Sequence, residues 1–117
     1  MKRAVVTGGT RGIGGAVTAR LRADGWRVVP VARHAPALPD ADFVACDVGD
    51  PAAVGRLFAG IDRLDALVNC AGLAGANTLD GDDALWHAIV NSNLNGTWYC
   101  CKAALPKLAD GSGRIVN

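Results

Sequence analysis

Short apolar runs alternate with stretches of helical periodicity along almost the whole chain. The apolar runs, each ending at turn residues, are 4–6, 27–32, 42–46, 64–69 and 114–116. Apolar residues at helical spacing predict helices at 12–24, from Asp50 onward, and from Asp82 or Asp83 to about Leu105. Strands that alternate with helices in this way form right-handed crossovers and a parallel sheet. The sequence therefore predicts an α/β fold with one doubly wound parallel sheet.

Three local features of the sequence support, weaken or modify the prediction of individual elements. Asp50 followed by Pro51 is a strong helix start, because it places an N-cap residue before proline at the first helical position. Pro30 weakens the prediction of a strand at 27–32, since proline removes a ladder donor. Three asparagines within residues 91–95 predict either a local distortion or a hydrated site in the long helix, because asparagine is a poor helix former.

A glycine-rich loop joins the first expected strand to the first expected helix. It reads Thr-Gly-Gly-Thr-Arg-Gly-Ile-Gly over residues 7–14. At such a junction the backbone can turn sharply, approach a pyrophosphate closely and direct free helix N–H groups at it. Side chains at Gly8, Gly12 or Gly14 would obstruct one of these contacts. Because of its position in the first strand–helix unit, the loop is predicted to bind phosphate rather than to form an ordinary turn.

Composition argues against several other classes of function. The net charge is +1 with both signs mixed along the chain, so no basic patch for nucleic acid is expected. No apolar stretch approaches the length of a membrane span, and the apolar run after Met1 is too short for a signal peptide. The four cysteines form no Cys-x-x-Cys pair. We interpret them as small hydrophobic residues in a reducing cytoplasm, without a metal site.

Beyond the glycine loop, four further segments carry motifs in the order in which one known family has them. The five segments are 7–14, Cys-Asp-Val at 46–48, Asn-Cys-Ala-Gly at 69–72, Asn-Leu-Asn-Gly-Thr at 93–97, and Gly-Arg-Ile-Val-Asn at 113–117. Together they resemble the short-chain dehydrogenase/reductase family, in its shorter-chain branch. Cys70 departs from the pattern, since the family has a second asparagine there. The resemblance covers essentially the whole chain and implies a Rossmann-like fold with strand order 3-2-1-4-5.

The resemblance also implies roles for individual residues. Asp47 falls where the family's acid contacts the adenine, and Asn93 where an asparagine orders a water in the proton relay, so Asn93 is the catalytic candidate. The residues expected to bind the cofactor are Gly8, Thr10, Arg11, Gly12, Ile13, Gly14, Arg33, Asp47, Val48, Asn69, Ala71 and Gly72. Each motif has a structural alternative: Asp47 can cap a turn, Asn69 can join strand ends by hydrogen bonds, and Asn93 can be a helix surface residue.

The end of the second strand indicates which nicotinamide cofactor is bound. An NAD site normally has an Asp or Glu there for the ribose hydroxyls, but no acid occurs at residues 25–39. Arg33 occupies that place, and Arg11 in the glycine loop can approach it. A guanidinium can bind a 2′-phosphate through two hydrogen bonds. The sequence therefore favours NADP(H) over NAD(H); in the alternative, both arginines are solvated surface residues.

The hydride chemistry of the family requires a Ser, a Tyr and a Lys, with the last two in a Tyr-x-x-x-Lys pair. Tyr99 and Lys102 are one residue too close together and fall on the helix of Asn93, so they are not expected to be that pair. We therefore expect residues 1–117 to be a single dinucleotide-binding domain, cut at the fifth strand and inactive alone. The complete enzyme would act on a carbonyl/alcohol pair as a homodimer or homotetramer. The alternatives are a non-catalytic NADP(H)-binding module or sensor, and a remnant that does not fold alone.

Overall fold

The computed structural model describes all 117 residues and contains one five-stranded parallel sheet. Its strand order is β3-β2-β1-β4-β5, which confirms the predicted order. The strands are β1 (Arg3–Thr7), β2 (Arg27–Ala32), β3 (Val44–Ala45), β4 (Ala66–Asn69) and β5 (Arg114–Val116). The helices are α1 (Gly12–Ala23), α2 (Pro51–Ala59), α3 (Asp83–Val90) and α4 (Gly96–Ala104), with a π-helical segment η1 (Asn91–Asn95) and a 3-10 turn η2 (Leu105–Lys107).

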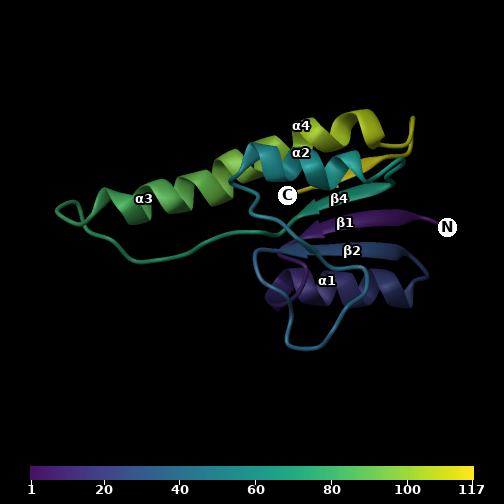
Figure 1. Cartoon of the computed structure of the whole chain (residues 1–117), viewed down its shortest axis with the longest axis horizontal. Helices are drawn as coiled ribbons and strands as arrows, with labels where there is room; N and C mark the ends of the chain where they lie inside the picture. Colours follow the sequence, from purple (N-terminus) through teal and green to yellow (C-terminus); the bar gives the residue numbers. More distant parts are fainter.

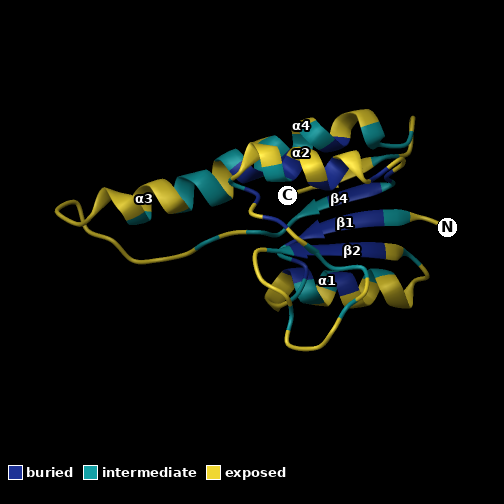
Figure 2. Cartoon of the chain, viewed as in Figure 1, coloured by how far each residue is buried: buried dark blue, intermediate teal, exposed yellow.

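The sheet is covered by helices on both faces. α1 lies on one face, and α2 and α4 lie together on the other (Figure 1). Asp50 caps α2 as predicted, because its carboxylate accepts a hydrogen bond from the Ala52 N–H at 3.0 Å. The predicted apolar face of α2 is buried against β1, β2 and β4 and consists of Val54, Leu57, Phe58 and Ile61. The core therefore lies between the sheet and the α2–α4 layer, as Figure 2 shows by burial.

Pro30 lies inside β2 without breaking it, and the geometry of the sheet explains why. The Val31 carbonyl accepts from Gly9 N on the β1 side of β2, whereas the Ala32 carbonyl accepts from Cys46 N on the β3 side. Backbone groups alternate along a strand, so the nitrogen of Pro30 faces the β3 side. There β3 pairs only with Val31 and Ala32, so no ladder bond is lost.

The third strand is shorter than the predicted range 42–46. The Asp40 carboxylate accepts from the Asp42 N–H at 3.0 Å, and the Asp40 carbonyl accepts from the Phe43 N–H at 3.2 Å. These bonds turn the chain locally, and Asp40 is also paired with Arg22 at 2.8 Å. The turn delays strand pairing to Val44, which leaves much of the β2 edge without a neighbouring strand.

The predicted long helix is present, but it is composite. α3 and α4 are joined by the π-helical segment Asn91–Asn95, which is the distortion that the three asparagines predict. None of the residues of α3 is buried, and α3 projects from the body of the sheet together with the loop before it (Figures 1 and 2). No helix is long and apolar enough to cross a membrane.

Candidate functional site

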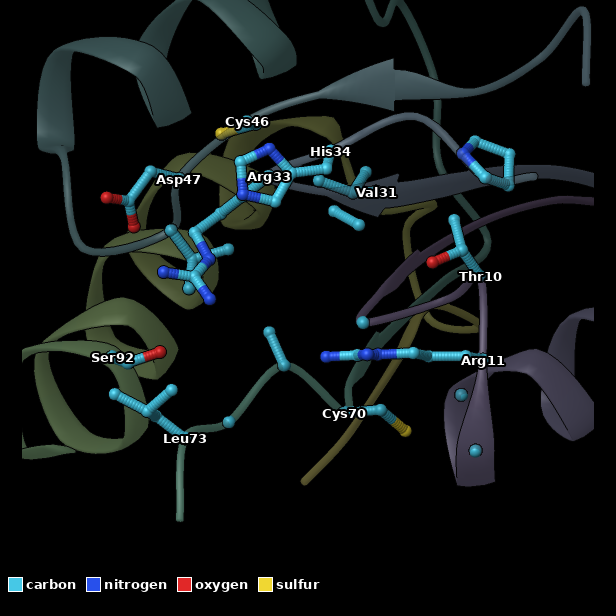
Figure 3. Close-up of a pocket in the computed structure, with 18 of the residues that line it drawn as sticks. Thr10, Arg11, Val31, Arg33, His34, Cys46, Asp47, Cys70, Leu73 and Ser92 are labelled. Atoms are coloured by element: carbon cyan, nitrogen blue, oxygen red, sulfur yellow. The ribbon is translucent and has the colours of Figure 1, made fainter. Parts of the chain in front are cut away.

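The carboxyl ends of β1, β2 and β4 open into a cleft with a volume of about 650 Å³. Ligands of open α/β sheets bind at this edge, where the strand order reverses. Its walls come from the glycine loop, the loop after β2, the segment after β3, and the segment after β4 (Figure 3). Of the twelve residues expected to bind the cofactor, eleven line this cleft; the exception is Asn69.

The glycine loop packs too closely for side chains at its end. A Cβ on Gly14 would collide with the carbonyl of Gly8 and would lie 3.2 Å from Cβ of Cys70. Gly12 has φ +59°, a left-handed conformation that strains any residue with a Cβ, and open space lies beside it. The backbone of the loop therefore borders the cleft directly. No acidic side chain occupies the first turn of α1, and no side chain caps it, so its N–H groups are available to an anion.

Arg11 and Arg33 both extend into the cleft. Figure 3 shows Arg11 entering from the glycine-loop side and Arg33 from the opposite side, near Asp47. Both side chains are exposed, and neither guanidinium forms an ion pair or hydrogen bond within the chain. By contrast, Arg20 and Arg22 are paired with aspartates at 3.0 and 2.8 Å. The cleft thus holds two cations with free donors and a single carboxylate, that of Asp47.

Asp47 and Val48 follow β3 at the floor of the cleft. The Asp47 carboxylate accepts a hydrogen bond from the Gly49 N–H at 2.9 Å. Asp47 therefore caps a turn, as the structural alternative in the sequence analysis predicts. Its second oxygen has no partner within the chain, and the side chain is exposed to the cleft. The turn is held from the helix side, because Asn91 Nδ2 donates to the Gly49 carbonyl at 3.1 Å. Asp47 is therefore free to contact a ligand while its backbone is fixed.

The segment after β4 is tied to the end of β1. The Ala71 N–H donates to Oγ1 of the buried Thr7 at 3.1 Å, which places Ala71 and Gly72 beside the glycine loop. Cys70, which replaces the family's second asparagine, also lines the cleft. Burial raises the pKa of the Cys70 thiol, which is therefore neutral at physiological pH.

Two predicted residues lie outside the cleft lining. Asn69 Nδ2 donates to Asn117 Oδ1 at 2.9 Å and lies 3.5 Å from Cys101 Sγ, so the side chain joins the ends of β4 and β5 to α4. Asn93 accepts from the Leu73 N–H at 2.7 Å and donates to the Leu73 carbonyl at 2.9 Å. The side chain of Asn93 thus positions backbone next to the cleft, whereas Asn69 bonds only to other side chains.

Several residues of the cleft were not anticipated from the sequence. They are Val31, Ala32, His34, Ala35, Pro36, Ala37, Cys46, Cys70, Leu73 and Ser92. Most of them lie in the same loops as predicted site residues. Because the loops at the carboxyl ends of parallel strands meet at one edge of the sheet, these residues could have been predicted from the sequence. Ser92 directly precedes Asn93, but it lies in the π-helical segment and not in a loop after a strand, so that rule alone does not find it.

A glycine-rich loop at the β1–α1 junction, beside the point where a parallel sheet reverses its order, is characteristic of a Rossmann-like fold. The sequence also matches the profile of the short chain dehydrogenase family over residues 2–117. The chain belongs to this family, whose members bind nicotinamide cofactors.

Individual relatives support this assignment. The chain is 36% identical to a 3beta-hydroxysteroid dehydrogenase of Mediterraneibacter gnavus, over 97% of this chain and 47% of the relative. It is 39% identical to a putative ketoacyl reductase of the granaticin polyketide synthase of Streptomyces violaceoruber, over 97% of this chain and 53% of the relative. The chain thus spans about half the length of the curated relatives it matches.

The fold has close counterparts among solved structures. A short-chain oxidoreductase from Brucella ovis, in complex with a partially ordered NAD, superposes with a TM-score of 0.85 at 27% identity. The superposition covers 99% of this chain and 61% of that protein.

Proposed function

We propose that this chain is the NADP(H)-binding part of an oxidoreductase that transfers hydride between nicotinamide and a carbonyl/alcohol substrate. We choose NADP(H) because two arginines without partners, Arg11 and Arg33, extend into one cleft from two sides. A 2′-phosphate carries close to two negative charges, which two guanidinium groups would balance. No acidic side chain lies at the end of β2, where an NAD site would have one.

The described residues fit the rest of this cofactor as well. The first-turn N–H groups of α1 would receive the pyrophosphate, and Gly12 and Gly14 keep that approach open. Asp47 and Val48 would border the adenine, and the backbone of Ala71 and Gly72 would contact the part of the cofactor nearest β4. Asn93 would act by holding the backbone of Leu73, next to Gly72, and Asn69 by joining the ends of β4 and β5. Bound nicotinamide would supply or accept the hydride.

The experiment that tests this assignment is a comparison of NADPH and NADH binding by fluorescence titration. The parent chain should prefer NADPH. Arg33→Asp should weaken NADPH binding by about 1.5–3 kcal/mol, or tenfold or more, and strengthen NADH binding. Arg11→Gln should weaken NADPH alone. Arg20→Gln is the matched control, because Arg20 is paired with Asp24 on the exposed side of α1. Equal affinity of the parent for both cofactors would refute the assignment.

We further propose that residues 1–117 alone do not catalyse hydride transfer. General acid–base catalysis needs a group within hydrogen-bonding reach of the reacting proton. The single tyrosine, Tyr99, packs against the hydrophobic core from α4 and does not line the cleft. Tyr99 is therefore a packing residue, which agrees with its rejection as a catalytic residue from motif spacing.

A non-catalytic NADP(H)-binding module is the second candidate, and the position of Tyr99 in the core, away from the cleft, favours it. The two candidates differ in what the chain needs in order to be stable. A module should be a monodisperse protein that binds NADPH alone. The cofactor-binding part of an enzyme should recover stable folding and activity only with a segment that supplies Ser and Tyr-x-x-x-Lys.

A further inference from the structure

A second cavity, of about 420 Å³, lies among the amino-terminal half of β2, residues 41–45 and the outer face of α2. It exists because β3 begins late and leaves this edge of β2 without a neighbouring strand. The cavity is near the amino ends of β1 and β2, whereas the nicotinamide cleft is at their carboxyl ends. It also adjoins the β3 edge of the sheet, opposite the edge formed by β5.

Three arginines from three different elements line this cavity. Arg3 and Arg27 are direct neighbours across the β1–β2 pair, and Arg56 comes from α2 above them. The alternation along β1 and β2 puts Arg3 and Arg27 on the face of Val5 and Val29, which α2 covers. Like charges side by side on one face of a sheet repel each other. An anion bound between the arginines would relieve such repulsion.

The chain itself supplies too little negative charge for this cluster. Asp42 is the only carboxylate that lines the cavity, 3.8 Å from Arg27 and also 3.9 Å from Arg22 outside it. Asp65, which directly precedes β4, accepts from the Arg3 backbone N–H at 2.8 Å and faces Arg63 at 3.5 Å. It forms no ion pair with the Arg3 side chain.

The Arg3 side chain is the clearest sign of a missing partner. Its Nε is the one buried side-chain nitrogen or oxygen in the chain without a hydrogen-bond partner. A buried donor left unpaired is unfavourable by about 1–3 kcal/mol, and by more when it is charged. The guanidinium groups of Arg3 and Arg56 form no ion pair at all. Because this Nε is closed to solvent, a bound oxyanion would contact the outer nitrogens of the guanidinium groups, where it would separate the three positive charges.

The rest of the cavity wall is apolar. It includes Val29, Phe43, Val44 and Leu57. The cluster has an excess of two positive charges over Asp42, which matches a phosphate monoester of about −1.5 to −2 better than a carboxylate of −1. We propose that this arginine pocket is a second ligand site, which binds a small organic phosphate with an apolar or aromatic body.

The test is equilibrium dialysis of the full 117-residue chain with phenyl phosphate, which does not require a monodisperse sample. We expect saturable binding that Arg56→Gln and Arg3→Gln each weaken by about tenfold or more. Arg56 lies on the exposed side of α2, so its variant should fold even if that of Arg3 does not. Arg20→Gln, outside both cavities, should bind as the parent does.

The other outcomes would overturn the proposal in distinct ways. No saturable binding would show that the arginines are only solvated charges. Binding weakened by Arg11→Gln or Arg33→Gln, but not by Arg56→Gln, would place the ligand in the nicotinamide cleft. If inorganic phosphate binds as tightly as phenyl phosphate, the apolar part of the ligand contributes nothing, which would refute that part of the proposal. If benzoate, a monoanion, binds as tightly as phenyl phosphate, the proposed preference for a dianion would be refuted.

Discussion

The side chain of Asn93 holds both backbone polar groups of Leu73. Its Oδ1 accepts from the Leu73 N–H at 2.7 Å, and its Nδ2 donates to the Leu73 carbonyl at 2.9 Å. This pair of bonds joins the π-helical segment to the segment after β4, and Leu73 lines the cleft at the carboxyl ends of the strands. The same helix segment reaches the other wall, because Asn91 binds the carbonyl of Gly49. The π-helical segment thus sets the positions of two walls of the cleft.

Replacement of Asn93 should loosen the segment after β4. Asn93→Ala removes two hydrogen bonds, each with a net contribution of about 0.5–1.5 kcal/mol. Asn93→Asp keeps an acceptor for the Leu73 N–H but sets a carboxylate against the Leu73 carbonyl. We expect amide exchange at Leu73 to be about tenfold faster in both variants. Hydrogen exchange followed by NMR or mass spectrometry measures this directly.

The control for Asn93 is Asn77→Ala, because Asn77 binds only within its own exposed loop, through the Thr78 N–H and the Asp82 carbonyl. That variant should leave Leu73 unchanged. Unaltered exchange at Leu73 in both Asn93 variants would show that other contacts hold this wall.

The glycine loop should not tolerate a side chain at Gly14. Because a Cβ there collides with the Gly8 carbonyl, Gly14→Val must displace the backbone that borders the cleft. We expect NADPH binding to be lost in a fluorescence titration. Gly55→Ala is the matched control, since its Cβ meets nothing within 4 Å in the middle of α2. That change should stabilise the fold by about 0.5–1 kcal/mol. Unchanged affinity of a folded Gly14→Val protein would mean that the loop is only a turn.

Alkaline pH should destabilise the fold through Cys100. Burial in the core raises the pKa of this thiol from 9.0 to about 12. The folded chain therefore keeps a proton that the unfolded chain loses. The contribution to stability is complete below pH 9 and disappears as the pH rises from 9 toward 12. Urea unfolding of the parent and of Cys100→Ala across this range isolates the effect, because all other titrating groups are common to both. The parent should lose stability more steeply, and parallel curves would contradict the assignment.

Local sequence patterns predicted the alternation of strands and helices and the ends of most elements, whereas the strand order came from the family resemblance. The cap at Asp50 and the helix distortion at the three asparagines are examples. The short β3 was not predicted, because the turn at Asp40 depends on its ion pair with Arg22, eighteen residues away. Pro30 weakened the prediction of a strand at 27–32, because the sequence does not show that the nitrogen of Pro30 faces an edge without a neighbouring strand.

The candidate site was predictable to a similar degree. Motif positions indicated the residues that line the cleft, but not how they are held. The bonds of Asn69 to the end of β5, and of Asn91 to Gly49, join residues 48 and 42 positions apart. No local pattern encodes such contacts. The arginine pocket was missed for the same reason, because Arg3, Arg27 and Arg56 become neighbours only through sheet register and helix packing.

The last prediction concerns the exposed apolar surface of the long helix. Trp86, Leu94, Trp98 and Leu105 are each about two-thirds exposed. Leu94, Trp98 and Leu105 are spaced four and seven residues apart, as on one side of a helix, opposite the buried Cys100 and Ala104. Contiguous apolar surface of this kind promotes association. The β5 edge adds to it, because Ile115 is 37% and Val116 53% exposed.

We therefore expect residues 1–117 to self-associate in light scattering and to show no turnover of carbonyl substrates. Trp98→Lys and Leu94→Lys should each reduce association, since they place a charge within the exposed surface. Leu38→Lys is the control, because Leu38 is 81% exposed in the loop after β2, away from α4. A monodisperse monomer that binds NADPH tightly would instead favour the non-catalytic binding module. Turnover by the purified chain would contradict both interpretations, because neither provides the Tyr-x-x-x-Lys pair that the hydride chemistry of the family requires.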